Sequence, residues 1–111
     1  MADEFGYLKT FGYSVILLQD GQQFYENTFK NPVLIIGRDD DCDLNIQSAS
    51  VSRKHLKLEI DDDKLFATDL GSSNGTIIDG IQISGKVQIN SRSVIKAGRI
   101  TIQIKLPDSA Q

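Results

Sequence analysis

Short segments of alternating apolar and polar residues recur along this chain, and turn sequences separate them. In residues 100–106 every second residue, beginning with Ile100, is Ile or Leu, and the residues between are polar. In residues 54–60 the apolar set begins at Leu56, which puts His55 on the polar side. Because successive side chains of a strand point to opposite faces, both segments are predicted to be strands with one buried face.

No long segment has the apolar spacing of a helix. Further strands are predicted over residues 13–18, 23–29, 33–37, 65–70, 76–78, 87–89 and 93–96. We expect about eleven short strands in an all-β fold, a two-sheet antiparallel β-sandwich. The 111 residues are enough for one domain, expected over residues 13–106. Residues 1–12 are expected to form an N-terminal arm or an extra edge strand, and residues 107–111 a C-terminal tail.

Charge and cysteine content limit the classes of partner. The chain has 12 Lys and Arg residues against 15 Asp and Glu residues, a formal net charge of -3, whereas nucleic-acid binders have a basic surplus on one face. We therefore expect no direct nucleic-acid partner. No apolar run is long enough to cross a bilayer, so no membrane association is expected. The single cysteine, Cys42, closes no intrachain disulfide, which predicts an intracellular protein. We expect its location to be the nucleus or the cytoplasm.

Three patterns resemble enzyme or metal sites but fail on inspection. Residues 80–86 have the glycine and lysine spacing of a P-loop, yet Val87 follows where a Ser or Thr is required. The acidic residues at positions 39, 41 and 43 resemble a calcium loop that lacks its glycine and its final glutamate. His55 and Cys42 have no orienting third group. We expect no enzyme activity, no catalytic residue, no metal and no cofactor.

Small polar and basic residues gather instead in three segments that adjoin predicted strands. They are Gly37-Arg38, residues 50–55 and residues 69–76. A phosphate dianion presents only acceptors, so its binding site must supply guanidinium N–H groups, hydroxyls and backbone N–H groups. The three segments contain all of these donors.

In order and spacing, these segments resemble the forkhead-associated (FHA) domain family. The resemblance rests on Gly37-Arg38, on Ser52-Arg53-Lys54-His55 and on residues 70–76, and it covers residues 13–106. It implies that Arg38 and Ser52 hold a phosphate. The other residues that it implies for the phosphopeptide site are Arg53 and Ser73 at the phosphate and Asn74 at the peptide backbone. The positions that it implies to be architectural are Gly37, His55, Gly75 and Thr76.

The resemblance also implies a function: a phosphothreonine-dependent protein interaction module of signalling, including the DNA damage response in the nucleus, with the binding loops at one end of the sandwich. Its partners would be phosphothreonine-containing proteins. Ser50, Ile78 and Asp79 are candidates for setting preference around the phosphothreonine. Ser50 is uncharged, so Arg53 or Lys54 is the candidate partner for an acidic peptide residue. The alternative is a phosphate-independent interaction, such as a homodimer, through an exposed sheet edge or residues 5–13.

Overall fold

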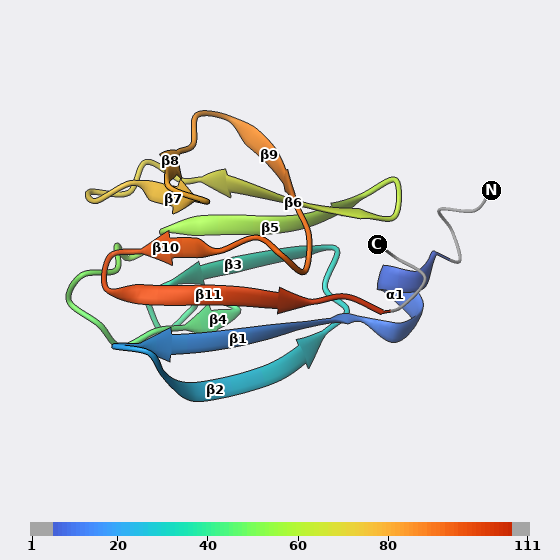
Figure 1. Cartoon of the computed structure of the whole chain (residues 1–111), viewed down its shortest axis with the longest axis horizontal. Helices are drawn as coiled ribbons and strands as arrows, with labels where there is room; N and C mark the ends of the chain where they lie inside the picture. Colours follow the sequence, from blue (N-terminus) through green and yellow to red (C-terminus); the bar gives the residue numbers. More distant parts are fainter. Residues whose placement is uncertain (1–5, 108–111) are drawn as a thin grey trace.

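A computed structural model describes residues 6–107, which form two β-sheets packed face to face (Figure 1). The first sheet has six strands in the order β2-β1-β11-β10-β7-β8. Their bounds are β1 Tyr13–Gln19, β2 Gln22–Phe29, β7 Thr76–Ile78, β8 Ile81–Gln82, β10 Ile95–Ala97 and β11 Ile100–Lys105. All pairs in this sheet are antiparallel.

The second sheet has five strands in the order β4-β3-β5-β6-β9. Their bounds are β3 Val33–Gly37, β4 Leu44–Asn45, β5 Leu56–Asp61, β6 Lys64–Asp69 and β9 Lys86–Ile89. The expected all-β sandwich is confirmed, with one correction: β3 and β4 pair in parallel. The sequence prediction also missed β4 and β8, because two residues are too few to show alternation.

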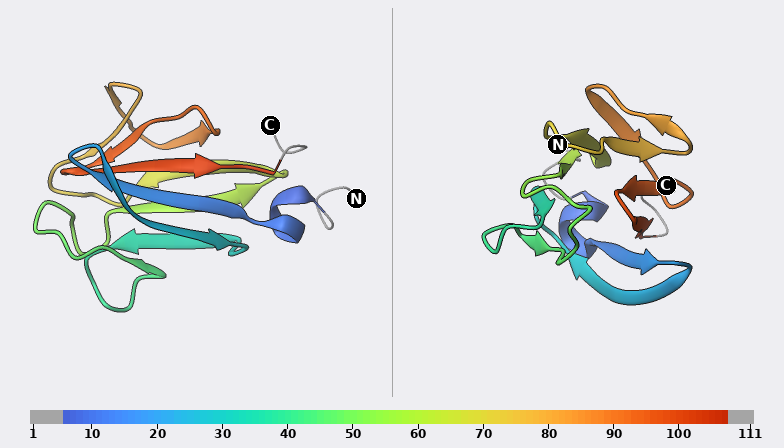
Figure 2. Two further views of the ribbon diagram at one scale, coloured as in Figure 1. Left: turned by 60° about the horizontal axis from the view of Figure 1, so that its bottom comes forward. Right: turned by 90° about the vertical axis from the view of Figure 1, so that its left-hand side faces the viewer.

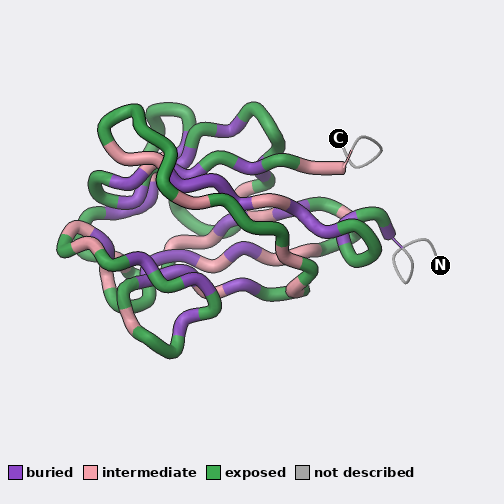
Figure 3. The backbone as a smooth tube through the Cα atoms, turned by 90° about the horizontal axis from the view of Figure 1, so that it is seen from below, coloured by how far each residue is buried: buried purple, intermediate pink, exposed green. Residues whose placement is uncertain are grey.

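The core lies between the sheets and consists of the apolar sets that the sequence predicts. Ile100, Ile102 and Ile104 of β11 are at most 2% exposed, and Leu56 and Leu58 of β5 are fully buried. Buried positions alternate with intermediate or exposed ones along most of these strands, and Figure 3 shows such alternation along the backbone. Such close-packed strands give a rigid support for the connecting loops.

The segment before β1 is neither an edge strand nor an arm where the structure describes it. Residues Tyr7–Phe11 form a short helix, α1, and its Leu8 is fully buried in the core. The Leu8 N–H donates to Asp63 Oδ1 at 2.9 Å, which fixes the helix to the turn between β5 and β6. Residues 1–5 and 108–111, which include the rest of the predicted arm and tail, lie outside the described residues.

Strand directions decide which connections meet. Strands β3 and β6 end at the left in Figure 1, and β5 begins there, so the segments after β3, before β5 and between β6 and β7 lie at this end. The turn between β10 and β11 joins them, whereas α1 lies at the opposite end (Figures 1 and 2). Within residues 6–107, no helix has the length and apolar character needed to cross a membrane.

Candidate functional site

The loop after β3 and the loop before β5 are held together through their backbones. The Arg38 N–H donates to the Ser52 carbonyl at 3.0 Å, and the Asp39 N–H donates to the Arg53 carbonyl at 3.1 Å. A Cβ on Gly37 would lie 2.1 Å from the Arg53 carbonyl oxygen, so only glycine allows this approach. The predicted architectural role of Gly37 thus has a steric basis: it brings Arg38 beside Ser52.

Arg38 is exposed at the end of the sandwich, but its guanidinium is held in place. Its Nε donates to the Val51 carbonyl at 3.0 Å. An arginine has five N–H donors, so this bond leaves the four donors of the two terminal NH₂ groups available. No carboxylate among residues 6–107 pairs with Arg38. The side chain therefore presents an oriented, unpaired cation.

Ser52 and Ser73 come from different loops and meet through a hydrogen bond. The Ser73 N–H donates to Ser52 Oγ at 2.9 Å. Because this bond occupies a lone pair of the Ser52 hydroxyl, the hydroxyl proton remains free to be donated to a ligand. Ser73 itself is exposed beside it. The two serines thus supply hydroxyl donors at the loop before β5, the same loop to which Arg38 Nε donates.

Asn74 crosses from the loop between β6 and β7 to the loop before β5. Its Nδ2 donates to the Ser50 carbonyl at 2.8 Å, while the residue stays exposed. This bond fixes the amide and leaves Oδ1 and the second N–H for another molecule. Such a pair of one acceptor and one donor matches the backbone of an extended peptide.

His55 is completely buried, so its predicted position on the solvent side of a strand is wrong. It precedes β5, and the alternation of that strand does not extend to it. The Ser52 N–H donates to Nδ1 at 3.0 Å, which places the ring proton on Nε2, 2.9 Å from the Gly75 carbonyl that accepts it. One imidazole thus links the two loops that carry Ser52 and Asn74.

Asp69, at the end of β6, organises the loop from residue 70 to 75, and the sequence analysis did not single it out. Its Oδ2 accepts the N–H groups of Gly71 and Ser72 at 2.9 and 3.0 Å. Its Oδ1 accepts the hydroxyls of Ser72 at 2.5 Å and of buried Thr76 at 2.6 Å. An Asp followed two residues later by Gly and Ser is an Asx-turn signal, which was available in the sequence.

The pKa of Asp69 reflects this environment. Burial acts to raise the pKa, but the hydrogen bonds from the Ser72 and Thr76 hydroxyls and from the backbone N–H groups of Ser72 and Gly71 outweigh it. The pKa of the carboxyl therefore lies below its usual value. A carboxyl with a lowered pKa in the folded state stabilises the fold above its unfolded pKa of about 4 and loses that contribution as pH falls through the folded pKa.

We therefore expect Asp69 to stabilise the fold fully above about pH 4 and progressively less at lower pH. Asp69→Asn should lower the melting temperature at pH 7, and the difference from the parent protein should shrink as the pH is lowered toward 3. Thermal unfolding followed by circular dichroism across this range measures it. Asp62→Asn, at an exposed turn position with no hydrogen bond or ion pair among the described residues, is the matched control. A difference for Asp69→Asn that stays constant with pH contradicts the assignment.

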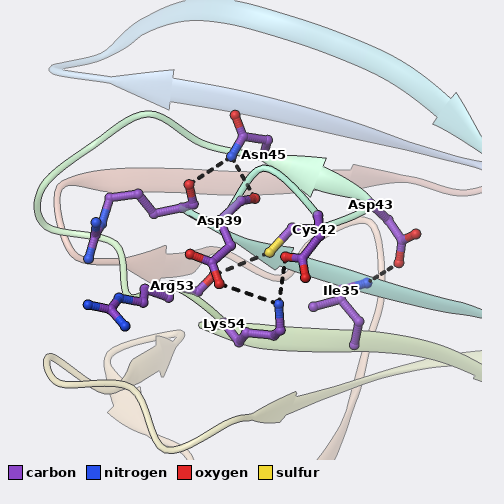
Figure 4. Close-up of polar contacts among 9 residues, drawn as sticks. Ile35, Asp39, Cys42, Asp43, Asn45, Arg53 and Lys54 are labelled. Atoms are coloured by element: carbon purple, nitrogen blue, oxygen red, sulfur yellow. Dashed lines mark hydrogen bonds and ion pairs between the residues drawn. The ribbon is translucent and has the colours of Figure 1, made fainter.

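The two cations after Ser52 have different environments (Figure 4). Lys54 Nζ lies 2.7 Å from Asp41 Oδ1 and 3.5 Å from Asp39 Oδ2. The hydrogen bond to Asp41 is the main cause that raises the pKa of Lys54 and lowers that of Asp41. Arg53 is exposed and has no carboxylate partner among residues 6–107. Arg53 therefore remains available to a ligand, while Lys54 is paired with Asp41 at the surface.

Two further side chains hold the backbone of both loops through hydrogen bonds to carbonyl groups. Cys42 Sγ donates to the Arg53 carbonyl at 3.2 Å, and Asn45 Nδ2 donates to the Arg38 and Asp39 carbonyls at 2.9 and 2.8 Å (Figure 4). Burial raises the pKa of the Cys42 thiol, so the sulfur serves this structural contact as a thiol. Both loops that carry cations are thus preorganised before a ligand arrives.

The three residues expected to set specificity do not act in the same way. Ser50 lies beneath Asn74, and its Oγ is occupied by Ser48 Oγ and the Arg99 N–H, each at 2.9 Å. Ile78 is 7% exposed and packs in the core. Asp79 Oδ1 accepts the Val94 N–H at 2.9 Å, away from the three loops. Ser50 therefore supports Asn74, while the specificity roles of Ser50, Ile78 and Asp79 stay predictions.

The signals for metal and nucleotide chemistry have structural explanations. Within residues 6–107, no three His, Cys, Asp or Glu side chains are grouped so that they could hold a metal ion. Residues 80–86 contain β8 and the first residue of β9, and no helix follows them up to residue 107. Lys86 pairs with Asp61 at 2.9 Å. The P-loop spacing is thus a connection between two short strands.

Comparison with known proteins agrees with this geometry. The model of the FHA domain family matches residues 34–98. FhaB of Mycolicibacterium smegmatis, an FHA domain-containing protein, is 28% identical over 78 residues, which are 70% of this chain and 50% of FhaB. The chain thus spans half the length of that relative.

Two solved structures are similar over most of the chain. The FHA domain of CT664 from Chlamydia trachomatis has a TM-score of 0.77 at 25% identity, with 85% of this chain and 96% of that domain covered. A domain from a structural and functional analysis of phosphothreonine-dependent FHA domain interactions has a TM-score of 0.73 at 28% identity, with 85% and 97% covered.

Proposed function

This chain belongs to the FHA domain family, and we propose that it is a phosphothreonine-dependent protein interaction module that binds phosphorylated segments of partner proteins. The observation that carries the proposal is the donor set at the loop end. The Arg38 guanidinium is anchored through Nε, and the Ser52 hydroxyl is left free to donate because the Ser73 N–H occupies its lone pair. This convergence of fixed donors suits an anion that only accepts hydrogen bonds.

In the proposed complex each loop has a distinct task. Arg38 and Ser52 hold the phosphate, and Arg53 and Ser73 add a charge and a hydroxyl at its sides. Asn74 bonds the peptide backbone. Gly37, His55, Gly75 and Thr76 keep the loops in register without touching the ligand. Because the loops are linked before binding, little conformational entropy is lost when the peptide docks.

The proposal is tested by titrating the protein with one peptide in two forms, with threonine and with phosphothreonine. Screening a library of phosphothreonine peptides identifies the peptide sequence to be used. Only the phosphorylated form should bind, because the unphosphorylated form offers the Arg38 and Ser52 donors no anion. Equal affinity for the two forms overturns the proposal and favours a phosphate-independent interaction.

We also expect the module to prefer phosphothreonine over phosphoserine. The additional methyl contributes about 0.8 kcal/mol when buried, and a β-branched side chain has fewer rotamers to lose. A packed niche for the methyl adds the cost of an unfilled void, so the preference should reach at least about tenfold. Titration with two peptides that differ only in this residue measures it. Equal affinities mean that the site recognises the phosphate without the residue that carries it.

The same residues support binding without catalysis. Both nitrogens of His55 are occupied by backbone groups, and the Cys42 thiol donates to the Arg53 carbonyl. Neither side chain is therefore available as a nucleophile or base. We propose a role in intracellular signalling, in keeping with the free Cys42. We propose no compartment or pathway beyond this, neither the nucleus nor the DNA damage response, because similar proteins come both from bacteria, such as FhaB, and from eukaryotes, such as PS1 of Arabidopsis thaliana.

A further inference from the structure

Asn74 differs from the other asparagines of the chain in the residue that follows it. Asparagine is one of the chemically labile residues of proteins, because the backbone nitrogen of the next residue can attack its side-chain carbonyl. A side chain on that next residue hinders the attack, and glycine has none. Of the five asparagines only Asn74 precedes a glycine, Gly75. The others precede Thr28, Pro32, Ile46 and Ser91.

The backbone N–H that follows Asn74 is not occupied by a hydrogen bond, unlike those after two other asparagines. The Thr28 N–H donates to the side chain before it at 2.9 Å, and the Ile46 N–H donates to a carbonyl of β3 at 2.8 Å. Pro32 has no N–H. The Gly75 N–H makes no hydrogen bond within residues 6–107. The nitrogen that can attack Asn74 is therefore unengaged.

The Asn74 side chain is open to water but restrained. The residue is exposed, and its Nδ2 donates to the Ser50 carbonyl at 2.8 Å. Gly75 itself is buried. The folded loop should therefore slow the attack relative to an unfolded chain. It does not prevent the attack, because water reaches the side chain and the Gly75 N–H has no protecting partner among the described residues.

We propose that Asn74 is a deamidation site and that its conversion weakens phosphopeptide binding. Hydroxide removes the Gly75 N–H proton, the nitrogen attacks Asn74 Cγ, and the Cγ–Nδ2 bond breaks. The leaving nitrogen takes a proton from water and departs as ammonia, which leaves a five-membered succinimide ring. Water then opens the ring at either carbonyl and gives aspartate or isoaspartate. The net change consumes one water and releases one ammonia, with no oxidation or reduction.

The effect on binding rests on the proposed function. A carboxylate has no N–H to donate, so the bond to the Ser50 carbonyl is lost and two acceptors face each other. The new negative charge adjoins Ser73, which is proposed for the phosphate, and like charges repel. Isoaspartate also inserts a methylene into the backbone before Gly75, whose carbonyl pairs with His55. Phosphopeptide affinity should therefore fall by about tenfold or more.

Mass spectrometry of the incubated protein tests the modification. Trypsin cleavage after Lys64 and Lys86 releases residues 65–86, in which Asn74 is the only asparagine. This peptide should show the amide-to-acid mass change before any peptide with another asparagine, and faster at higher pH because the N–H must lose its proton. The folded protein should convert more slowly than the urea-unfolded chain. A folded protein that stays intact at Asn74 after the unfolded chain has converted, or that converts elsewhere first, overturns the inference.

Ion-exchange chromatography then separates converted from intact protein, and each is titrated with one phosphothreonine peptide. The converted protein and the variant Asn74→Asp should both bind about tenfold or more weakly. Asn90→Asp is the matched control, since it makes the same charge change at an exposed residue after β9 and keeps the Oδ1 that accepts the Arg92 N–H. It should bind like the parent protein. Equal binding by converted and intact protein overturns the inference, as do equal losses for the two variants.

The mass measurement needs no peptide ligand, so the failure of this inference and that of the proposed function are distinguishable. If the intact protein binds no phosphothreonine peptide, the proposed function fails and the effect of Asn74 on binding fails with it. The mass measurement alone still decides whether Asn74 is the deamidation site.

Discussion

Arg38→Ala should remove phosphopeptide binding and leave the melting temperature unchanged. The variant loses the four terminal guanidinium donors that no other group of the described chain uses. Loss of one partner from a desolvated charged contact costs about 2–5 kcal/mol, which is about 30-fold to more than 1,000-fold in affinity. The fold should be unaffected, because Arg38 is exposed and lies outside the hydrophobic core.

Two titrations and two thermal unfolding curves measure this effect. Arg92→Ala is the control, since it deletes an arginine that lies outside the three loops. It should bind like the parent protein. If Arg38→Ala binds within threefold of the parent, Arg38 is not the phosphate anchor. If its melting temperature falls, the loss of binding reflects a disturbed fold and the assignment fails as well.

His55→Ala should destabilise the domain strongly and weaken binding with it. The substitution leaves the buried Gly75 carbonyl and the part-buried Ser52 N–H without partners, and it opens a cavity where the fully buried ring stood. Each unsatisfied buried group costs about 1–3 kcal/mol, before the cavity is counted. For a domain of this size the melting temperature should fall by at least about 10 °C.

The control for His55→Ala is Ser73→Ala, which removes an exposed hydroxyl from the same group of loops without emptying buried space. Its melting temperature should match that of the parent, while its phosphopeptide affinity falls. Circular dichroism melting curves of the three proteins settle the comparison. Equal melting temperatures for His55→Ala and the parent would show that the imidazole does not brace the loops.

Much of the fold is readable from local pattern. The strands predicted over residues 33–37 and 76–78 have the same first and last residues as β3 and β7. The strand predicted over residues 100–106 is one residue longer than β11. Strand periodicity and turn residues are local properties, so they can be recognised in the sequence without the tertiary structure. Strands β4 and β8 and helix α1 were missed, since each is short and depends on a neighbour, as α1 depends on Asp63.

The candidate site divides in the same way. The sequence indicated which donors to propose for the site, because Gly37-Arg38, Ser52-Arg53 and Ser73-Asn74 follow or precede predicted strands in the order that resembles the family. Only the tertiary structure decided that His55 is buried, that Lys54 pairs with Asp41 and that Arg99 lies beside Ser50. Residues 50 and 99 are 49 positions apart, and no local pattern records such a contact. The sequence gives the type of each residue directly. The burial of a side chain and its pairing with another depend on strands that come together only when the two sheets pack over the core.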